Sequence, residues 1–235
     1  SWIGGFTMES HKEDVTYTPR VVSIVEDQSP KTYDITVHFP DSETPLAPDD
    51  SIWPAIIDAF SERVTCNRST LIFTRTRAQA ERITRDLNAR FESPVAYAHH
   101  GALSHEFRRE VESAMKSGTV KTIVATGSLE LGIDIGDLDE VLHLQTPSSM
   151  SAAIQRSGRA GHQAGAISKA SLHPVFPHDL LESTVLSRAI RDREIEEIQP
   201  VLNALDVLAL IISSMVLTEG LKTEILYQFL RTCSA

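Results

Sequence analysis

The stretch "TLIFTRTRAQAERI", residues 70–83, predicts a strand followed directly by a helix. It opens with a short apolar run of the kind that forms a buried strand. Thr76 and Gln79 then have the spacing of a capping box, in which two side chains satisfy backbone N–H groups at the start of a helix. The apolar positions that follow recur at helical spacing: Ala80, Ile83, Leu87 and Phe91. We therefore predict one strand–helix unit here.

The same alternation continues along the chain. Short apolar runs predict further strands at residues 95–99, 120–126, 140–145 and 166–172. Between them, one helix begins at Ser104 and stops near Gly118, and another spans residues 148–158. Strands that alternate with helices predict an α/β fold, namely a doubly wound, mostly parallel sheet with helices on both faces.

The flanking segments are less regular. Residues 20–27 and 31–40 have strand character, and the turn between them allows the two to pair as a hairpin. An amphipathic helix begins near residue 51, after an acidic loop rich in proline. Beyond it, three later stretches have helical patterns: residues 177–192, 202–215 and 219–232.

Composition limits the classes of protein that fit. The chain has 235 residues, 41% of them hydrophobic, which suffices for at least one full core. Its formal net charge of −10 argues against a protein that coats nucleic acid indiscriminately, because phosphate binding depends on Lys and Arg. A local basic groove is still compatible with this charge, since six arginines lie between Arg68 and Arg90 against two acids. A solvated helix face is the simpler interpretation of that cluster.

Cysteine usage and hydropathy indicate the compartment. Cys66 and Cys233 have no metal-ligand spacing, so we expect no disulfide framework and a reducing compartment, the cytoplasm. Asn203 and Asp206 interrupt the apolar stretch 201–217, which favours a buried helix over a membrane span. The chain opens on serine rather than methionine, which suggests an excised part of a longer protein.

A turn of small residues follows the strand at 120–126. Ligands of such sheets bind beyond the carboxyl ends of the strands. The turn consists of three small residues: Thr126, Gly127 and Ser128. Backbone N–H groups can approach a phosphate in such a turn. Glu130 and Asp134 follow around Gly132, and a carboxylate there can bind a ribose hydroxyl or orient an arginine. An ordinary strand–turn–helix junction is the alternative.

The segment "QRSGRAGH", residues 155–162, is a second candidate for anion chemistry. Arg156 and Arg159 stand beside Gly158 and Gly161. A guanidinium presents a rigid fork of donors that can stabilise charge on a transferring phosphoryl group. The alternative is a helix end whose arginines interact favourably with the helix dipole. No G-x-x-x-x-G-K-[ST] pattern occurs in the sequence, so the chain lacks a Walker A loop.

The nine histidines raise a metal-dependent hydrolase as another alternative. No H-E-x-x-H or comparable ligand spacing is present. His99 and His100 are adjacent on a predicted strand end, so their side chains should point in opposite directions. We therefore expect no metal site in this chain.

Three of these segments together resemble a known family. In this order, "IFTRTRAQAERI", "AHHGALSHEFRREVESAMKSGTVKTIVATGSLELGIDIG" and "QRSGRAGH" resemble the second RecA-like motor domain of superfamily-two helicases. The forms "SLELGIDIG" and "GRAGH" are typical of the large helicase-related (Lhr) group. The resemblance covers about residues 20–215 and implies a RecA-like sheet that leads into the helical start of a winged-helix domain.

The resemblance implies an ATP-side group of residues. "QRSGRAGH" matches motif VI, which would make Arg159 the arginine finger that reaches the γ-phosphate of ATP, supported by Arg156, Gln155 and Gly158. Such a finger contributes about a thousandfold or more to turnover. Gly132 and Asp134, in the segment that matches motif V, would lie near the ATP. Many relatives carry a third arginine where this chain has His162, an ending that the Lhr group shares, so we expect no phosphate contact there.

A second group is implied to contact nucleic acid. Motif V supplies Thr126 and Gly127 for the nucleic-acid backbone. Thr74 and Arg75 match motif IV. Gly101 and Arg108 match the adjoining strand-contacting motif.

The resemblance also implies partners. ATP and Mg²⁺ would be held mainly by a first RecA-like motor domain of the same full-length chain, because the Walker A loop and the acidic magnesium-binding box are not in this sequence. Residues 1–18 would be an entry segment from that domain, 19–198 the second RecA-like domain, and 199–235 the truncated start of a winged-helix domain. The track would be single-stranded or partly duplex nucleic acid, and no membrane is implied.

The implied function is that of a C-terminal motor-domain fragment of an ATP-dependent DNA or RNA helicase or translocase, inactive by itself. The alternative is a non-catalytic RecA-like module that binds nucleic acid or a protein.

Overall fold

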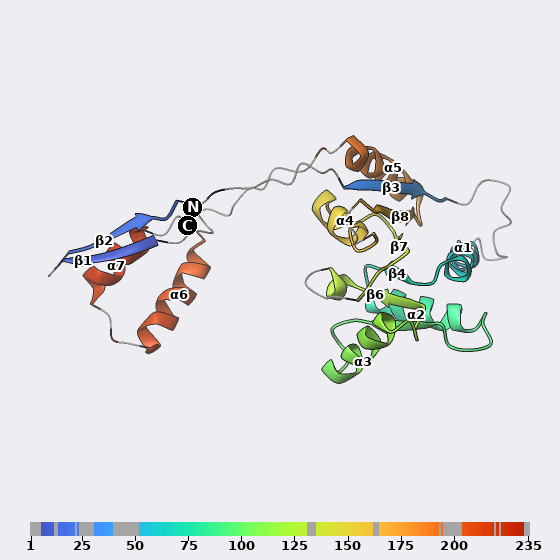
Figure 1. Ribbon diagram of the computed structural model, residues 1–235, viewed down its shortest axis with the longest axis horizontal. Helices are drawn as coiled ribbons and strands as arrows, with labels where there is room; N and C mark the ends of the chain where they lie inside the picture. Colours follow the sequence, from blue (N-terminus) through green and yellow to red (C-terminus); the bar gives the residue numbers. More distant parts are fainter. Residues whose placement is uncertain are drawn as a thin grey trace. The chain divides into compact units, whose positions relative to one another are not determined.

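The computed structural model describes residues 6–11, 14–21, 23, 31–39, 52–130, 135–161, 165–192, 194, 204–218, 220 and 222–232. The chain divides into two compact units. Residues 29–196 form one unit, and residues 1–28 together with 197–235 form the other. Figure 1 shows the elements of both.

Six parallel strands form the sheet of the larger unit, in the order β3-β8-β7-β4-β6-β5. Their bounds are β3 (Thr32–Val37), β4 (Thr70–Phe73), β5 (Ala96–His99), β6 (Thr122–Ala125), β7 (Glu140–Leu144) and β8 (Ile167–His173). Helices alternate with these strands along the chain. The predicted doubly wound α/β fold is confirmed, and the carboxyl ends of all six strands meet at one edge.

The described part of this unit contains five α-helices: α1 (Trp53–Cys66), α2 (Arg77–Asn88), α3 (His105–Lys116), α4 (Met150–Ser157) and α5 (Pro177–Asp192). The capping box predicted for α2 is present, with Thr76 and Gln79 each accepting a hydrogen bond from the other's backbone N–H. Ser104 caps α3 by accepting from the N–H of Phe107 at 3.2 Å. Gly118 follows α3 with a φ of +75°, a conformation that glycine adopts without strain.

Successive residues of the central strands face opposite sides of the sheet, and both sides are buried. Leu71 and Phe73 of β4 pack with residues of α3, while Ile72 packs with residues of α1 and α2. Since α4 places Ser157 against β7 on the Phe73 side, α3 and α4 cover one face and α1 and α2 cover the other. This burial on both sides explains why the strands read as continuous apolar runs.

The hairpin that residues 20–27 and 31–40 could form lies largely outside the described residues, which omit 22 and 24–30. Among the strands of the described residues, β3 lies at the edge of the large sheet and pairs in parallel with β8. Of the preceding segment, the structure describes Arg20, Val21 and Ser23, and none of them lies in a strand. Alternating apolar residues in β3 correctly indicated a strand with one covered face, but such a pattern does not specify which strand lies beside it.

The smaller unit combines the two ends of the sequence. Strands β1 (Phe6–His11) and β2 (Asp14–Pro19) form an antiparallel hairpin, and α6 (Leu205–Thr218) and α7 (Thr223–Thr232) belong to the same unit. None of the helices among the described residues is long and apolar enough to cross a membrane.

Helix α6 differs from the expectation of a buried helix. The helix itself is confirmed, but its large apolar side chains are exposed, with Leu210 at 70% and Leu217 at 88%. Apolar side chains occupy most positions of α6, so a partner that packs on one side of the helix leaves others exposed.

Two histidines are buried in the core of the sheet. His143 on β7 stacks on Phe73 and lies 3.2 Å from the hydroxyl of Ser157, whereas His173 on β8 packs edge-on against Phe60 of α1. Burial lowers the pKa of both imidazoles from 6.5 to about 3; neighbouring Arg156 adds to the effect at His143, and nearby cationic groups add to it at His173. Both side chains are therefore neutral in the folded protein at neutral pH.

We predict that these histidines make the fold sensitive to acid. Between pH 6.5 and about 3 these two histidines bind protons in the unfolded chain but not in the folded one. The free energy of unfolding should therefore fall as pH falls. Each histidine contributes up to about 1.4 kcal/mol per pH unit in this window. Urea unfolding at pH 7, 6, 5 and 4.5 should show a shallower dependence for His143→Gln than for the wild type. The surface substitution His178→Gln is the control, and equal slopes for wild type and His143→Gln would contradict the prediction.

Candidate functional site

The loops that follow β4, β5 and β6 meet at the carboxyl edge of the sheet. After β6 the chain turns through the short 3₁₀ helix η1 (Gly127–Leu129) and reaches Glu130. After β7, a loop leads into α4, which carries Arg156 and is followed directly by Arg159. The parallel register thus brings together the two segments that the sequence marked as separate candidates for anion binding.

Glu130 contacts both arginines. Its carboxylate oxygen Oε2 lies 3.4 Å from Nη2 of Arg156, and its backbone carbonyl accepts a hydrogen bond from Nη2 of Arg159 at 2.6 Å. The carboxylate also abuts Gly127, where an added Cβ would lie 3.3 Å from Oε2. The sequence suggested that a carboxylate at this position orients an arginine, and the structure shows this contact.

Arg156 also packs against an aromatic ring. Its guanidinium carbon lies 5.1 Å from the centre of the Phe73 ring, within the range of a cation–π contact. Its side chain is 14% exposed, and its Nε atom is buried without a hydrogen-bond partner among the described residues. Arg156 is therefore a largely buried cation in a prepared position, in contrast to a surface arginine at a helix end.

The turn after α4 is fixed by backbone contacts. Lys31, just before β3, donates from Nζ to the carbonyl of Gly158 at 2.8 Å, and burial lowers the pKa of this amine. Gly161 has a φ of +65°, and a Cβ there would lie 2.7 Å from the carbonyl oxygen of Ile167. Sequence reasoning missed Lys31, because it precedes Gly158 by 127 residues and no local pattern links the two.

Of the two motif IV residues, Arg75 is exposed and Thr74 is not. Thr74 is 2% exposed, its hydroxyl donates within the protein to backbone carbonyls, and its N–H donates to the carbonyl of Ala125 at 2.8 Å. Arg75 reaches across to donate to the carbonyl of Thr146 at 2.7 Å. The structure thus gives Thr74 a supporting position, and only Arg75 presents its side chain at the surface.

The remaining nucleic-acid candidates lie on neighbouring loops. Gly101 is exposed directly after β5, and Arg108 is half-buried on α3. Thr126 is half-buried and Gly127 exposed in the turn after β6, which is the neighbour of β5 in the sheet. These four residues therefore share one side of the carboxyl edge.

Three positions singled out in the sequence, Gly132, Asp134 and His162, lie outside the described residues. Gln155 is described and is exposed on α4. Where the chain is described, no group of three or more histidine, cysteine, aspartate or glutamate residues could hold a metal ion.

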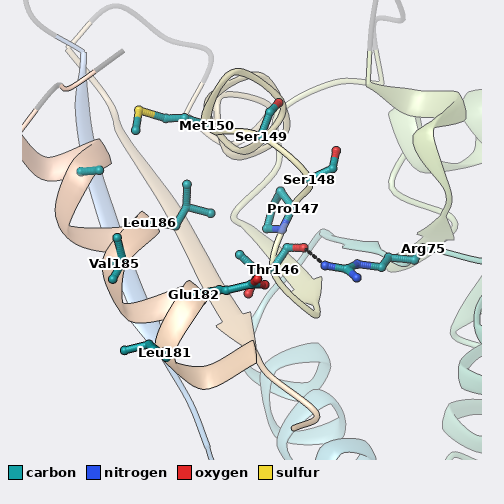
Figure 2. A pocket seen from close by; sticks show the side chains of 11 residues that line it. Arg75, Thr146, Pro147, Ser148, Ser149, Met150, Leu181, Glu182, Val185 and Leu186 are labelled. Carbon is teal, nitrogen blue, oxygen red and sulfur yellow. Dashed lines mark hydrogen bonds between the residues drawn. The ribbon is translucent and has the colours of Figure 1, made fainter. Parts of the chain in front are cut away.

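An open groove of about 550 Å³ adjoins Arg75. One wall is the loop from Thr146 to the start of α4, and the other is an apolar face of α5 that includes Leu181 and Val185. Figure 2 shows Arg75 hydrogen-bonded to the carbonyl of Thr146 at one end of this groove. Thr146 itself is anchored to α5, because its hydroxyl lies 2.6 Å from the carboxylate of the buried Asp179.

His99 joins segments that the sequence treated separately. It is fully buried, with Nδ1 2.8 Å from the hydroxyl of Ser128 and Nε2 2.9 Å from the carboxylate of Glu112 on α3. Its neighbour His100 instead contacts Glu81 of α2, at 2.8 Å. The two side chains point in opposite directions, as expected, but the pairing of His99 with Ser128 carried no signal in the sequence.

Comparison with known proteins identifies the fold. Residues 54–164 match the family described as helicase conserved C-terminal domain. The ATP-dependent helicase Lhr-Core of Saccharolobus solfataricus is 38% identical over 218 residues, which cover 90% of this chain and 25% of that protein. The chain carries the second RecA-like domain of an Lhr-type superfamily-two helicase.

Two further relatives agree with this assignment. The Lhr-type domain is 38% identical to the Lhr helicase/uracil glycosylase of Escherichia coli over 190 residues, 68% of this chain and 12% of that protein. The solved structure of the Mycobacterium smegmatis helicase Lhr bound to ssDNA and AMP-PNP superposes with a TM-score of 0.79 at 35% identity, covering 83% of this chain and 26% of that one. The chain thus spans about a quarter or less of the length of these relatives.

We predict that Gly161→Ala destabilises the Lhr-type domain because it forces a side chain into a left-handed conformation and against the backbone of β8. The two effects together should lower the free energy of unfolding by about 2–4 kcal/mol. Gly101→Ala is the matched control, since a Cβ there meets open space, and its effect should stay within about 0.5 kcal/mol. Chemical denaturation of both variants provides the test. Equal stability of the two would show that the turn after α4 is not constrained as described.

Proposed function

We propose that this chain is the second motor-domain part of an ATP-dependent helicase or translocase that acts on nucleic acid. The observation that carries the proposal is the position of Glu130. Its backbone and side chain contact Arg159 and Arg156, which suit ATP, and its carboxylate abuts Gly127 in the turn that suits a nucleic-acid backbone. A motor requires its two ligands to affect each other, and here one residue contacts both candidate sites.

The positive charge of the two arginines and their fixed positions suit the binding of a nucleotide. Arg156 is a largely buried cation whose Nε has no hydrogen-bond partner among the described residues, and Arg159 lies in a turn fixed by Gly158 and Gly161. ATP, when bound, supplies the phosphoanhydride bond whose hydrolysis drives the cycle. In our proposal Arg159 stabilises charge on the γ-phosphate, and Arg156 and Gln155 support it.

Other ATP-side contacts rest on the motif match alone. Gly132 and Asp134 remain proposed neighbours of the nucleotide. Mg²⁺ and most contacts to ATP would come from a first RecA-like domain of the full-length protein, because the motif match assigns the Walker A loop and the acidic magnesium-binding box to that domain.

Nucleic acid would cross the adjoining loops. We assign backbone contacts to Arg75, Gly101, Arg108, Thr126 and Gly127, which lie after three neighbouring strands, with Thr74 in a supporting role. The Mycobacterium smegmatis relative was solved with ssDNA and AMP-PNP, which supports both classes of ligand. The other proposed partners are the first motor domain and a winged-helix domain of the same protein. The cytoplasm, which the cysteine usage favours, is the proposed compartment.

We predict that Arg159→Ala in the full-length protein lowers kcat for ATP hydrolysis about a thousandfold or more, because charge on the transferred phosphoryl group loses its stabilisation. Arg188→Ala is the matched control, since Arg188 is an exposed arginine on α5 that pairs with Asp192. Steady-state ATPase assays with single-stranded DNA or RNA provide the measurement. The 235-residue chain alone should hydrolyse ATP at a negligible rate.

Two outcomes would contradict the proposal. Full ATPase activity in Arg159→Ala would show that Arg159 does not take part in ATP hydrolysis. A full-length wild-type protein that binds nucleic acid but does not hydrolyse ATP would instead support the non-catalytic RecA-like module.

A further inference from the structure

We propose that His99 is a positioning residue that links the two nucleic-acid loops of this domain, by tying Ser128 in the turn after β6 to Glu112 on α3. The inference rests on the proposed function, because it assigns nucleic-acid contacts to both loops. It adds three residues, His99, Ser128 and Glu112, that the motif match did not assign to any contact.

The contacts to the turn after β6 are dense. The hydroxyl of Ser128 lies 2.8 Å from Nδ1 of His99 and 3.0 Å from the carbonyl oxygen of the same residue. The N–H of Thr126 also donates to that carbonyl, at 3.3 Å. Gly127 therefore lies between Thr126 and Ser128, which both form hydrogen bonds with His99.

The contact to α3 continues the link. Nε2 of His99 lies 2.9 Å from Oε1 of Glu112, one helical turn after Arg108. The imidazole is 0% exposed, so water does not reach its two ring nitrogens. Nε of Arg108 is buried with no hydrogen-bond partner among the described residues, so this arginine is also packed against the protein close to the link.

The protonation states of the partners decide the direction of each hydrogen bond. A carboxylate can only accept, so Nε2–H of His99 donates to Glu112. A neutral imidazole then leaves Nδ1 as an acceptor, and the hydroxyl of Ser128 shares its one proton between Nδ1 and the carbonyl oxygen of His99. Burial favours this neutral form by lowering the pKa of His99, and Arg108 acts in the same direction, although Glu112 opposes both. The chain of donors therefore runs from Ser128 through His99 to Glu112.

This link has a consequence for binding. Thr126 and Gly127 lie in a turn that His99 links to α3, and α3 carries Arg108. A nucleic-acid backbone that displaces this turn should therefore also displace α3. Because the imidazole that joins them is buried, a shift in one loop should be passed to the other. Both loops should then bind the nucleic-acid strand together. The displacement of the turn should also reach Arg156 and Arg159 through Glu130.

The test uses the full-length enzyme and compares ATP hydrolysis with and without a single-stranded oligonucleotide. Ser128→Ala and Glu112→Ala each break the link, whereas Glu112→Gln keeps an acceptor for Nε2–H. Ser171→Ala is the matched control, because it removes a buried serine–histidine contact of 3.1 Å, to His173, from a strand outside both loops. Urea unfolding of every variant separates a general loss of stability from a loss of coupling.

We expect Ser128→Ala and Glu112→Ala to reduce stimulation by the oligonucleotide about tenfold and to raise the oligonucleotide concentration for half-stimulation by a similar factor. The double variant should lose no more stimulation than the more impaired of the two single variants, because both substitutions break the same chain of hydrogen bonds. Glu112→Gln and Ser171→Ala should retain the stimulation of the wild type.

Two results would overturn the inference. Equal stimulation in Ser128→Ala and Ser171→Ala would show that the link is only structural, and independent, multiplying effects of Ser128→Ala and Glu112→Ala would show that no link exists. A wild-type enzyme whose ATP hydrolysis does not respond to nucleic acid would overturn the proposed function itself, and this inference with it.

Discussion

The parallel register around β4 is the constraint on which the whole site depends. Because β6 and β7 flank β4 and run in the same direction, the turn after β6 and the helix after β7 both return over its last residue. That residue, Phe73, underlies the guanidinium of Arg156 at 5.1 Å and the ring of His143 at 5.8 Å. If β4 slipped by one residue, Phe73 would turn to the opposite face and Arg156 would lose its support.

Much of this arrangement could be predicted from local sequence. The capping box at Thr76 and Gln79 and the apolar runs of the central strands depend only on neighbouring residues, so the pattern alone identifies them. The contact of Glu130 with an arginine was also predictable, because a carboxylate after a strand of this sheet must emerge at the same edge as the helix that follows the next strand.

The remainder depends on tertiary contacts that no local pattern encodes. β3 pairs with a strand 135 residues later in register, as Thr32 does with Ile167, and Lys31 reaches Gly158 only because of that pairing. Thr74 matched a contact motif, yet its hydroxyl is consumed inside the protein. Likewise, the apolar composition of α6 predicted burial, but composition does not specify what covers a helix.

The geometry around Arg156 indicates how a nucleotide could change the domain. An ion pair between Arg and a carboxylate in its best geometry has an N–O distance of about 2.7–2.9 Å, whereas Arg156 and Glu130 are 3.4 Å apart. Among the described residues, this largely buried guanidinium has only a long ion pair and no partner for Nε, an arrangement that is costly in a site of low dielectric constant. In the proposed function, a phosphate that satisfies Arg156 weakens its hold on the Glu130 carboxylate, which abuts Gly127. In that proposal, occupation of the ATP side would alter the turn proposed to contact nucleic acid, and by reciprocity a bound strand that fixes this turn would alter the affinity for ATP.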